Sequence, residues 1–393
     1  MAGVSFGTLV VIVLAGLGGP ALGVLQHRFV PVVVGEILAG IIAGPAVLNA
    51  VHPSNATIEF LGNVGFAMLM LTAGMHLPLR DRRLAQAART GALRAAIVCA
   101  LALPAGLLAA ALAGTAHAAV YAVVLASGSA AVLLPALAEA GLDGGDVIEL
   151  VAQVTIADVI TILSVPIVLQ PGRVGHVVLG SALVAGAAIV LLLTARSLAG
   201  REWISRVRHL SKQRHWALDL RLALLVLFVL AWIAVQGGTS ILIAGFGAGV
   251  MVALIGGPKR LSTQVRGIAD GFFIPLYFVV LGARLDLGGL AHEPAMLALV
   301  AALTALNVLI HMLAAVLSRG SIPSALAASA QLGVPAAVAS LGLSEHLLSA
   351  VSATAIVVSA LLSLALSTLG VELLARPGAG APGPAGPAAA LGG

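Results

Sequence analysis

The sequence predicts an all-α polytopic membrane protein with about thirteen transmembrane helices. Of its 393 residues, 60% are hydrophobic and only 9% are charged, whereas a soluble domain carries about 25% charged residues. The hydrophobic residues gather in stretches of about 20, which is the length that a helix needs to cross the hydrocarbon core of a bilayer. Most charged residues fall in the short connections between these stretches. This pattern leaves no room for a separate soluble domain.

The predicted spans follow one another with short connections. They cover residues 5–25, 30–48, 58–77, 91–113, 117–137, 148–169, 176–197, 216–235, 240–255, 268–285, 294–317, 323–341 and 349–373. The first segment lacks a basic n-region and an A-x-A cleavage site, which favours a retained helix over a cleaved signal peptide. Residues 1–375 therefore form the transmembrane domain, and the Pro-, Gly- and Ala-rich residues 376–393 predict a disordered tail.

Lys and Arg are distributed unequally between the two sides of the predicted membrane. Sixteen of the 20 fall in alternate connections: Arg28, Arg80, Arg82, Arg83, Arg89, Arg196, Arg201, Arg206, Arg208, Lys212, Arg214, Lys259, Arg260, Arg266, Arg319 and Arg376. Because an excess of basic residues marks the cytoplasmic side, we expect a multi-pass protein of the cell inner (plasma) membrane with its N-terminus outside and its C-terminus in the cytoplasm. The net charge of +5 then comes from basic connections that set the topology in the membrane. We therefore expect the lipid bilayer as a partner and no nucleic-acid partner.

Two interrupted spans occupy matching places in the two halves of the chain. The longest cytoplasmic connection, about residues 198–215, separates these halves, and spans three to six then match spans ten to thirteen with opposite topology. Span five is interrupted at Ser127-Gly128-Ser129, and span twelve at Gln331-Leu332-Gly333 with Pro335 following. A matched pair of broken spans in inverted halves indicates the substrate site of a transporter. Unwound backbone at this depth is tolerated only where it lines a cavity or is buried in protein.

Asp158 is the strongest candidate for chemistry, because it lies near the middle of span six, roughly 15 Å along the helix. A carboxylate at that depth costs several kcal/mol unless it is paired, hydrated or protonated. Thr155 and Thr161 lie three residues away on either side and share its helix face. Such oxygens suit a small hard cation, and burial favours the neutral carboxyl group. The group can therefore hold a proton or a cation, but not both. The alternative is an aspartate that pairs with a neighbouring helix.

Other polar groups at the same depth are weaker candidates. His311 in span eleven is a possible partner of Asp158 or a titrating group of its own, and the alternative is a neutral histidine bonded to a backbone carbonyl. Ser127, Ser129 and Gln331 at the two breaks are candidate cation ligands together with Thr155 and Asp158. A serine in a helix often bonds a carbonyl of its own helix instead.

Motifs for nucleotide binding and hydrolysis are absent from the sequence. It contains no Walker A motif, no HExxH, no nucleophile elbow and no Gly-rich dinucleotide fingerprint. The single cysteine, Cys99, excludes a disulfide within the chain and any multi-cysteine metal site. We therefore expect neither an enzyme nor a resident cofactor.

Four segments resemble the monovalent cation:proton antiporters, and most closely the bacterial sodium/proton and Kef-type potassium branch. Residues 35–45 (GEILAGIIAGP) resemble the second-helix motif of this family, and residues 60–77 resemble its third helix. Ala157-Asp158 stands where the family carries an Asp-Asp, Asn-Asp or Gln-Asp pair, and residues 272–282 resemble the tenth helix. The resemblance extends over almost the whole chain, to about residue 373.

The resemblance implies a fold of thirteen helices with inverted repeats and two crossed discontinuous helices. It also implies a homodimer with an elevator-type core. Transport helices would lie at about 58–169 and 268–373, and dimerisation helices at about 1–50 and 176–255. Asp158 would carry the ion, and the ends of the broken helices would compensate its charge.

The chain departs from the family pattern at three places near the carrier. Ala157 replaces the first acid of the pair, and span eleven has no Lys or Arg, with His311 or Asn307 nearest to that position. Gln331-Leu332-Gly333 replaces the usual Arg-Gly-Glu of span twelve. These departures bear on the identity of the ion and on the stoichiometry.

We therefore expect a secondary antiporter that exchanges Na+ or K+ for H+ through Asp158. With one carboxylate, electroneutral exchange of one cation for one proton is favoured over an electrogenic ratio. Two alternatives stay open: a proton-independent cation channel on the same scaffold, and a non-transporting membrane sensor or assembly partner that has kept the fold.

Overall fold

The computed structural model describes residues 5–25, 31–199, 201–214, 216–256 and 259–376. Within these ranges the chain is helical and contains no strand. Eleven helices or helix pairs in the described ranges are long and apolar enough to cross a membrane, and two shorter apolar helices lie at the second and ninth predicted positions. The prediction of an all-α membrane fold with spans at thirteen positions is confirmed. The predicted tail at 377–393 lies outside the described residues.

The helices occur in the predicted order. The first half contains α1 (Phe6–Gly16), α2 (Gly18–Leu25), α3 (Val32–Ala43), α4 (Ala56–Met75), α5 (Arg82–Ala113), α6 (Ala118–Ala126), α7 (Ala130–Glu139), α8 (Gly145–Leu169) and α9 (Val174–Ala199). After α10 (Glu202–Gln213) come α11 (Leu218–Gln236), α12 (Ile241–Ile255), α13 (Lys259–Ile268), a π-helical turn (Ala269–Phe273), α14 (Ile274–Ala283), α15 (Leu287–His292), α16 (Pro294–Leu317), α17 (Ile322–Ala328), α18 (Gly333–Ser344) and α19 (Ala350–Leu374).

Local sequence signals set several helix ends. The Asn55 side chain accepts a hydrogen bond from the backbone N–H of Thr57 (2.9 Å) and begins α4, and the Asp81 carboxylate does the same for α5 through the N–H of Arg83 (2.8 Å). Both are preferred N-cap residues. Helix α5 ends at Gly114, whose φ of 64° is left-handed and therefore favours glycine. The second span is shorter than predicted, because α3 ends before Gly44-Pro45 and the residue before a proline disfavours the helical conformation.

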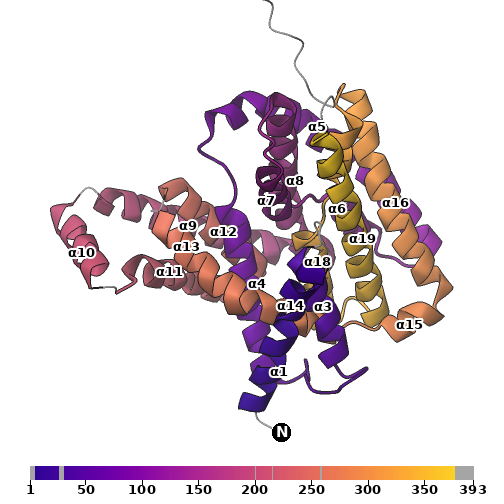
Figure 1. Ribbon diagram of the computed structural model, residues 1–393, viewed down its shortest axis with the longest axis horizontal. Coiled ribbons are helices and arrows are strands. Elements are labelled where there is room, and N and C mark those ends of the chain that lie inside the picture. Colours follow the sequence, from indigo (N-terminus) through magenta and orange to yellow (C-terminus); the bar gives the residue numbers. More distant parts are fainter. Residues whose placement is uncertain (1–4, 26–30, 200, 215, 257–258, 377–393) are drawn as a thin grey trace, which may run out of the picture.

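The helices pack in two groups (Figure 1). In one group α5 packs against α6, α8 and α16, while α19 packs against α16, α17 and α18. In the other group α12 packs against α4, α9 and α11, and α14 packs against α3 and α4. The division into transport and dimerisation helices stays a prediction. Within this packing α4, the third span, lies against α12, and α14, the tenth span, lies against α3 and α4.

Small residues allow close contact within the second group. A Cβ atom at Gly40 of α3 would collide with the backbone of Val279 of α14, and one at Gly65 of α4 would collide with the carbonyl of Phe273. Such close packing of small residues is the usual way in which membrane helices associate.

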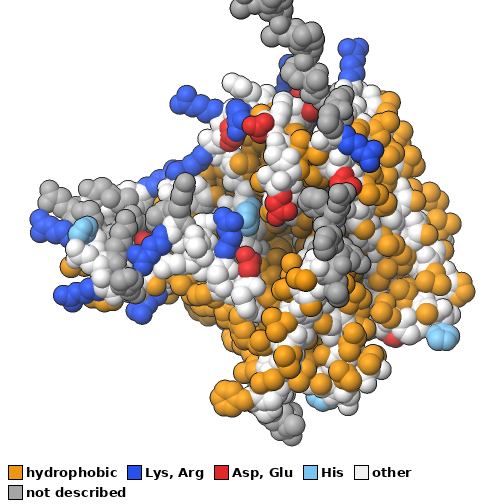
Figure 2. Space-filling view, viewed as in Figure 1, with side chains coloured by type: hydrophobic (Ala, Val, Ile, Leu, Met, Phe, Trp, Pro, Cys, Tyr) orange, Lys and Arg blue, Asp and Glu red, His pale blue; other side chains and the backbone are white. Residues whose placement is uncertain are grey.

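Large apolar side chains cover the outside of the molecule (Figure 2). Leu107 on α5, Trp232 on α11 and Val316 on α16 are each at least 64% exposed. Figure 2 also shows Lys and Arg side chains gathered around α10. This distribution fits helices that face lipid and a basic connection that faces one membrane surface.

Candidate functional site

Two helix interruptions define the candidate site, one between α6 and α7 and the other between α17 and α18. Each upstream half-helix ends in a serine whose hydroxyl donates to the carbonyl three residues earlier. Ser127 Oγ lies 2.7 Å from the Val124 carbonyl oxygen, and Ser329 Oγ lies 2.7 Å from that of Leu326. The interruptions predicted at spans five and twelve are therefore present, and they end in the same way in both halves.

Asp158 lies beside the first break, on α8. Its side chain is 8% exposed, and Oδ2 accepts a hydrogen bond of 2.9 Å from the backbone N–H of Ala130, the first residue of α7. The N-terminus of a helix carries a partial positive charge, so it stabilises the ionised carboxylate. Gly128 allows this approach, since a Cβ atom there would meet the Val154 side chain of α8.

The two threonines on either side of Asp158 differ in their partners. Thr161 is buried, and its hydroxyl donates to the Ala157 carbonyl oxygen at 2.7 Å. Thr155 is also buried, but its Oγ1 has no hydrogen-bond partner within the described part of the chain. A buried hydroxyl without a partner costs free energy. Thr155 therefore offers an unused oxygen one helical turn from the carboxylate.

The polar groups of the second break form a network of neutral amides. Gln331 Nε2 donates to the carbonyl oxygen of Val124 (2.7 Å) and to Asn307 Oδ1 (2.8 Å). Asn307 Nδ2 donates to the Ser329 carbonyl oxygen at 2.8 Å. Gln331 and Asn307 are 2% and 0% exposed, so the two breaks are joined inside the protein.

His311 lies next to this network rather than next to Asp158. Its ring Nδ1 is 2.8 Å from the Asn307 carbonyl oxygen, one turn earlier on the same helix. Among the described residues no hydrogen bond or ion pair joins His311 to Asp158. This contact matches the alternative of a histidine bonded to a backbone carbonyl, whereas the role of His311 as partner or titrating group stays a prediction. Ser129 is buried at the N-cap of α7, and its side chain makes no capping hydrogen bond.

A cavity of about 320 Å³ approaches the site from one side. Its lining includes Thr155 and Ile156 of α8 and Leu79 and Asp81 of the connection between α4 and α5. This connection belongs to the side on which the basic residues are concentrated. The cavity therefore lies on the predicted cytoplasmic side and has Thr155 in its lining, while the Thr155 hydroxyl oxygen itself is buried.

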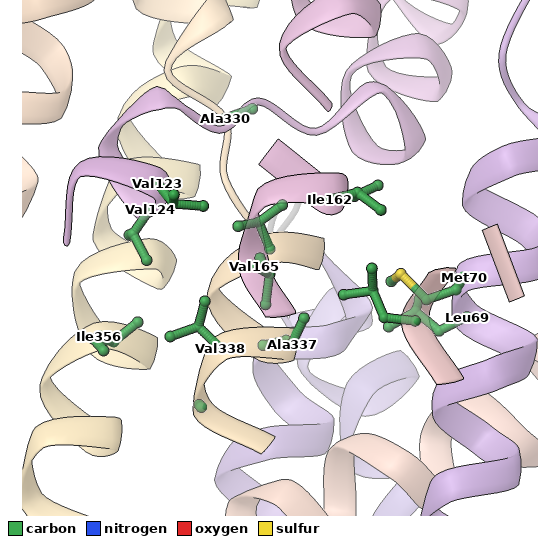
Figure 3. Packing of buried hydrophobic residues seen from close by; sticks show 14 of the residues in the cluster. Leu69, Met70, Val123, Val124, Ile162, Val165, Ala330, Ala337, Val338 and Ile356 are labelled. Carbon is green, nitrogen blue, oxygen red and sulfur yellow. The ribbon is translucent and has the colours of Figure 1, made fainter. Parts of the chain in front are cut away.

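Packed apolar side chains lie farther along α8, toward its C-terminal end (Figure 3). Leu69 and Met70 of α4, Ile162 and Val165 of α8, and Ala337 of α18 belong to one core cluster, and each is at most 8% exposed. Met70 also lies against the start of α18 at Gly333. We call these five residues the apolar seam. It contains side chains from both helix groups.

Three contacts, two of them at the site, could not be predicted from residue types alone. The donor to Asp158 is a backbone N–H at Ala130. The amide network joins residues that are 207 positions apart in the chain. An ion pair between Arg94 of α5 and Glu149 of α8, at 2.8 Å, links two helices of the first group. One indication of this pair was present in the sequence, because Arg94 lies within the predicted fourth span and an arginine there needs a partner.

Comparison with known proteins places this arrangement in a family. Residues 9–376 match the family model described as "Sodium/hydrogen exchanger, transmembrane". The chain belongs to this family. The match confirms the resemblance stated from the sequence.

Two individual proteins are similar to this exchanger-family chain. Over 322 residues it is 27% identical to "Putative Na(+)/H(+) antiporter YjbQ" of Bacillus subtilis (strain 168). The matched region covers 76% of this chain and 51% of that protein. The chain thus spans about half the length of this curated relative. The structure of the sodium proton antiporter MjNhaP1 from Methanocaldococcus jannaschii at pH 8 matches with a TM-score of 0.62 and 19% identity, covering 94% of this chain and 96% of that chain. This likeness confirms the fold.

Proposed function

We propose that the chain is a secondary antiporter that exchanges a monovalent cation, Na+ or K+, for H+ at Asp158. The observation that carries the proposal is a buried carboxylate at an interrupted helix, one turn from a buried hydroxyl without a partner. The match to the sodium/hydrogen exchanger family supports the reaction class.

The chemistry follows from the charge of one carboxyl group. A protonated Asp158 is neutral, and an ionised Asp158 that binds a monovalent cation is also neutral overall. An empty ionised carboxylate would bring a net charge through an apolar region, which costs several kcal/mol. Only the protonated form and the cation-bound form of the site therefore cross the membrane readily. Each cation that crosses in one direction then requires a proton to cross in the other. One carboxylate then gives one cation for one proton, without net charge movement.

The cation ligands would be oxygens around the first break. Asp158 and Thr155 supply a carboxylate and a hydroxyl, and Ser127 and Ser129 lie at the break itself. Oxygen ligands suit a hard cation. Gln331 was predicted as a ligand as well, but its amide N–H groups point to the Val124 carbonyl and to Asn307. We assign its amide nitrogen to holding the two breaks together.

Alternating access would require the first helix group to move against the second. The cavity beside Thr155 supports access from the cytoplasm, and the apolar seam supports closure toward the other side. An elevator-type movement would slide α8 and the two breaks along α4 and open the seam. In this proposal α4 and α14 belong to the stationary part, which also forms the homodimer, and the N-terminus lies outside the plasma membrane.

Exchange in proteoliposomes tests the proposal. Vesicles that contain the protein and a pH-sensitive dye receive a pulse of NaCl or KCl, and the change in internal pH is followed for wild type and for Asp158→Asn. We expect wild-type exchange that falls to the level of empty vesicles in Asp158→Asn. The matched control is Asp146→Asn, at the exposed start of the same helix, which should exchange like wild type. Equal activity in wild type and Asp158→Asn would refute the role of Asp158.

The same vesicles separate the two alternatives. A cation channel would carry a current without a proton gradient, which requires a continuous water path that the apolar seam opposes. A sensor would bind the cation without moving it. The missing first acid at Ala157 is the feature that favours a sensor. Cation-dependent stabilisation without any ion movement would decide for it.

A further inference from the structure

A buried hydrogen bond joins the two helix groups near the apolar seam. Tyr277 of α14 donates its hydroxyl hydrogen to the Ala336 carbonyl oxygen of α18 at 2.9 Å. The two residues are 2% and 3% exposed. Helix α14 packs against α3 and α4 in the second group, whereas α18 packs against α8 and α19 in the first. A carbonyl oxygen has two lone pairs, so this contact does not interrupt α18. We call it the intergroup bond.

The Tyr277 ring is held on the second group. It stacks on Phe66 of α4, with the ring centroids 5.2 Å apart and an angle of 25° between the ring planes. Gly65, the preceding residue of α4, allows this approach, because a Cβ atom there would lie 2.9 Å from the Tyr277 Cβ. The side chain is therefore fixed on one group, and the hydroxyl group at its far end binds the other.

Among the described residues, the other side-chain hydrogen bonds and ion pairs from one spanning helix to another stay within one group. Arg94 of α5 binds Glu149 of α8 within the first group, and Arg284 at the end of α14 binds Glu59 of α4 within the second. A movement of one group against the other would leave such contacts in place. The same movement would break the intergroup bond.

The intergroup bond lies between two cavities. The first is the cavity whose lining includes Thr155. The second, of about 420 Å³, has Asn63 of α4 and Leu169 of α8 in its lining. Along α8 the first cavity comes first, the apolar seam next and the second cavity last. Ala336, which accepts the intergroup bond, directly precedes Ala337 of the seam (Figure 3). The bond is therefore made at the level where the two sides of the membrane are separated.

We propose that Tyr277 is a positioning residue that holds the first helix group in the described state, with a cavity beside Thr155 and a packed apolar seam. The inference rests on the proposed function, because it assumes that the two groups move against each other during exchange. The intergroup bond is present in this state and is lost when α18 moves along α14. Removal of the hydroxyl group should therefore shift the equilibrium toward the opposite state by about fivefold, which corresponds to one net hydrogen bond.

Cysteine labelling from each side of the membrane tests this inference. In a Cys99→Ala background, which lacks the single native cysteine, Val165→Cys places a thiol in the seam. A membrane-impermeant methanethiosulfonate reagent is applied to right-side-out and to inside-out vesicles. Leu79→Cys, in the lining of the cavity beside Thr155, marks the side on which that cavity opens. From the opposite side, Tyr277→Phe should raise the labelling rate of Val165→Cys by about fivefold.

The second tyrosine of the chain provides the matched control. The chain contains two tyrosines, and Tyr121 is also buried, with its hydroxyl oxygen 3.0 Å from Thr115 Oγ1 within the first group. Tyr121→Phe removes the same hydroxyl group without affecting the intergroup bond, so the labelling rate should not change. A faster rate in both variants would indicate a general loosening and would overturn the proposal, and so would an unchanged rate in Tyr277→Phe.

The KM for Na+ on each side of the membrane provides a second readout. The apparent affinity of a site falls with the fraction of the protein in the state that can bind. Tyr277→Phe should lower the KM on the side opposite the cavity by about fivefold and leave the KM on the cavity side nearly unchanged. A change of the same size on both sides would indicate damage to the carrier and would contradict the role of Tyr277.

Fluorotyrosine provides a second route if Tyr277→Phe does not fold. In the Tyr121→Phe background Tyr277 is the one tyrosine left, so biosynthetic incorporation of 2-fluorotyrosine changes this position alone. The fluorine makes the phenol hydroxyl a stronger donor, so labelling of Val165→Cys from the side opposite the cavity should become slower. A disturbance of packing would make it faster, and a faster or unchanged rate would contradict the proposal.

The failure of this proposal and the failure of the proposed function can be told apart. Exchange by wild type and its loss in Asp158→Asn are measured in the same vesicles without the thiol reagent. If exchange occurs and the labelling rate is unchanged in Tyr277→Phe, the role of Tyr277 fails alone. If wild type moves no ions, the proposed function fails, and faster labelling in Tyr277→Phe would still establish the intergroup bond as the contact that holds the described state.

Discussion

The two interrupted spans end alike but are held by different chemistry. Both upstream half-helices close with a serine hydroxyl bonded to the carbonyl three residues before it. At the first break the carboxylate of Asp158 meets the N-terminus of α7, whereas Gln331 of the second break and Asn307 donate amide N–H groups to the carbonyl oxygens of Val124 and Ser329. An ionisable carboxyl group lies at the first break. The amides of Gln331 and Asn307 are neutral and do not ionise.

This difference indicates a division of labour between the two inverted halves. In the proposed function the first half would provide the group that exchanges ions, and the second half would provide its fixed surroundings. Substitutions at the first break should therefore change ion binding, whereas substitutions at the second break should change stability. Four variants test this difference, and they are given in order of decreasing expected effect on exchange.

Ala130→Pro removes the backbone N–H that donates to Asp158 among the described residues, without removing a side chain. Proline is tolerated in the first turn of a helix, so α7 should persist. A hydrogen bond to a charged group contributes about 1.5–3 kcal/mol, so Na+-driven exchange should fall by about tenfold or more, and its midpoint should move to higher pH. Ala130→Gly retains the N–H and is the control. Similar rates for the two variants would show that the α7 N-terminus does not stabilise the carboxylate.

Thr155→Val removes the hydroxyl that lacks a partner while preserving the shape of the side chain. The cation would lose one ligand, so we expect the KM for Na+ to rise by about fivefold, since a hydrogen-bond-sized interaction contributes about 1 kcal/mol. The melting temperature should not fall, because no hydrogen bond is broken. Thr161→Val is the matched control on the same helix, with its hydroxyl already bonded to Ala157. A KM that rises equally in both variants would exclude Thr155 as a specific ligand.

Asn307→Leu tests the structural character of the second break. The Ser329 carbonyl oxygen would lose its donor in a buried site, and an unpaired buried group costs about 1–3 kcal/mol. We expect a lower melting temperature in detergent, with exchange at the optimal pH reduced by less than about threefold, because the carboxylate is untouched. Abolished exchange in a variant that melts like wild type would mean that the second break also takes part in ion binding.

His311→Asn should have the smallest effect. The amide of asparagine can take the place of the ring Nδ1 beside the Asn307 carbonyl oxygen. If the histidine only bonds its own helix, exchange should remain within about twofold of wild type and keep its pH profile. A pH profile that loses one ionisation in this variant would instead establish His311 as a titrating group.

Hydropathy was sufficient to predict the number and order of the spans, because crossing a bilayer imposes a length and a composition on each helix. The interruptions were also predictable, since Ser127-Gly128-Ser129 and Gly333 with Pro335 are poor helix formers. The depth of Asp158 followed from counting along one helix. These features are all local in the sequence.

The contacts between distant segments could not be predicted in this way. The donor at Ala130 is a backbone group, which any residue except proline would provide. The reach of Gln331 to Val124 depends on how two breaks cross, and the packing of α4 against α12 depends on which helices are neighbours. Hydropathy does not predict which helices are neighbours, because lipid and protein present equally apolar surroundings to a helix. The early end of α3 was predictable in principle from Gly44-Pro45, and the apolar count of residues 30–48 obscured it.

Competition between a proton and a cation for one carboxylate is the central claim, and binding measures it most directly. The melting temperature of the purified protein in detergent is recorded against the concentration of NaCl, KCl and LiCl at a series of pH values, with a large organic cation holding ionic strength constant. A ligand that binds only the folded state stabilises it according to its concentration relative to Kd. We predict that the apparent Kd of the stabilising cation increases about tenfold for each pH unit below the midpoint, and that Asp158→Asn shows no stabilisation. Stabilisation that is independent of pH, or that persists in Asp158→Asn, would contradict the account.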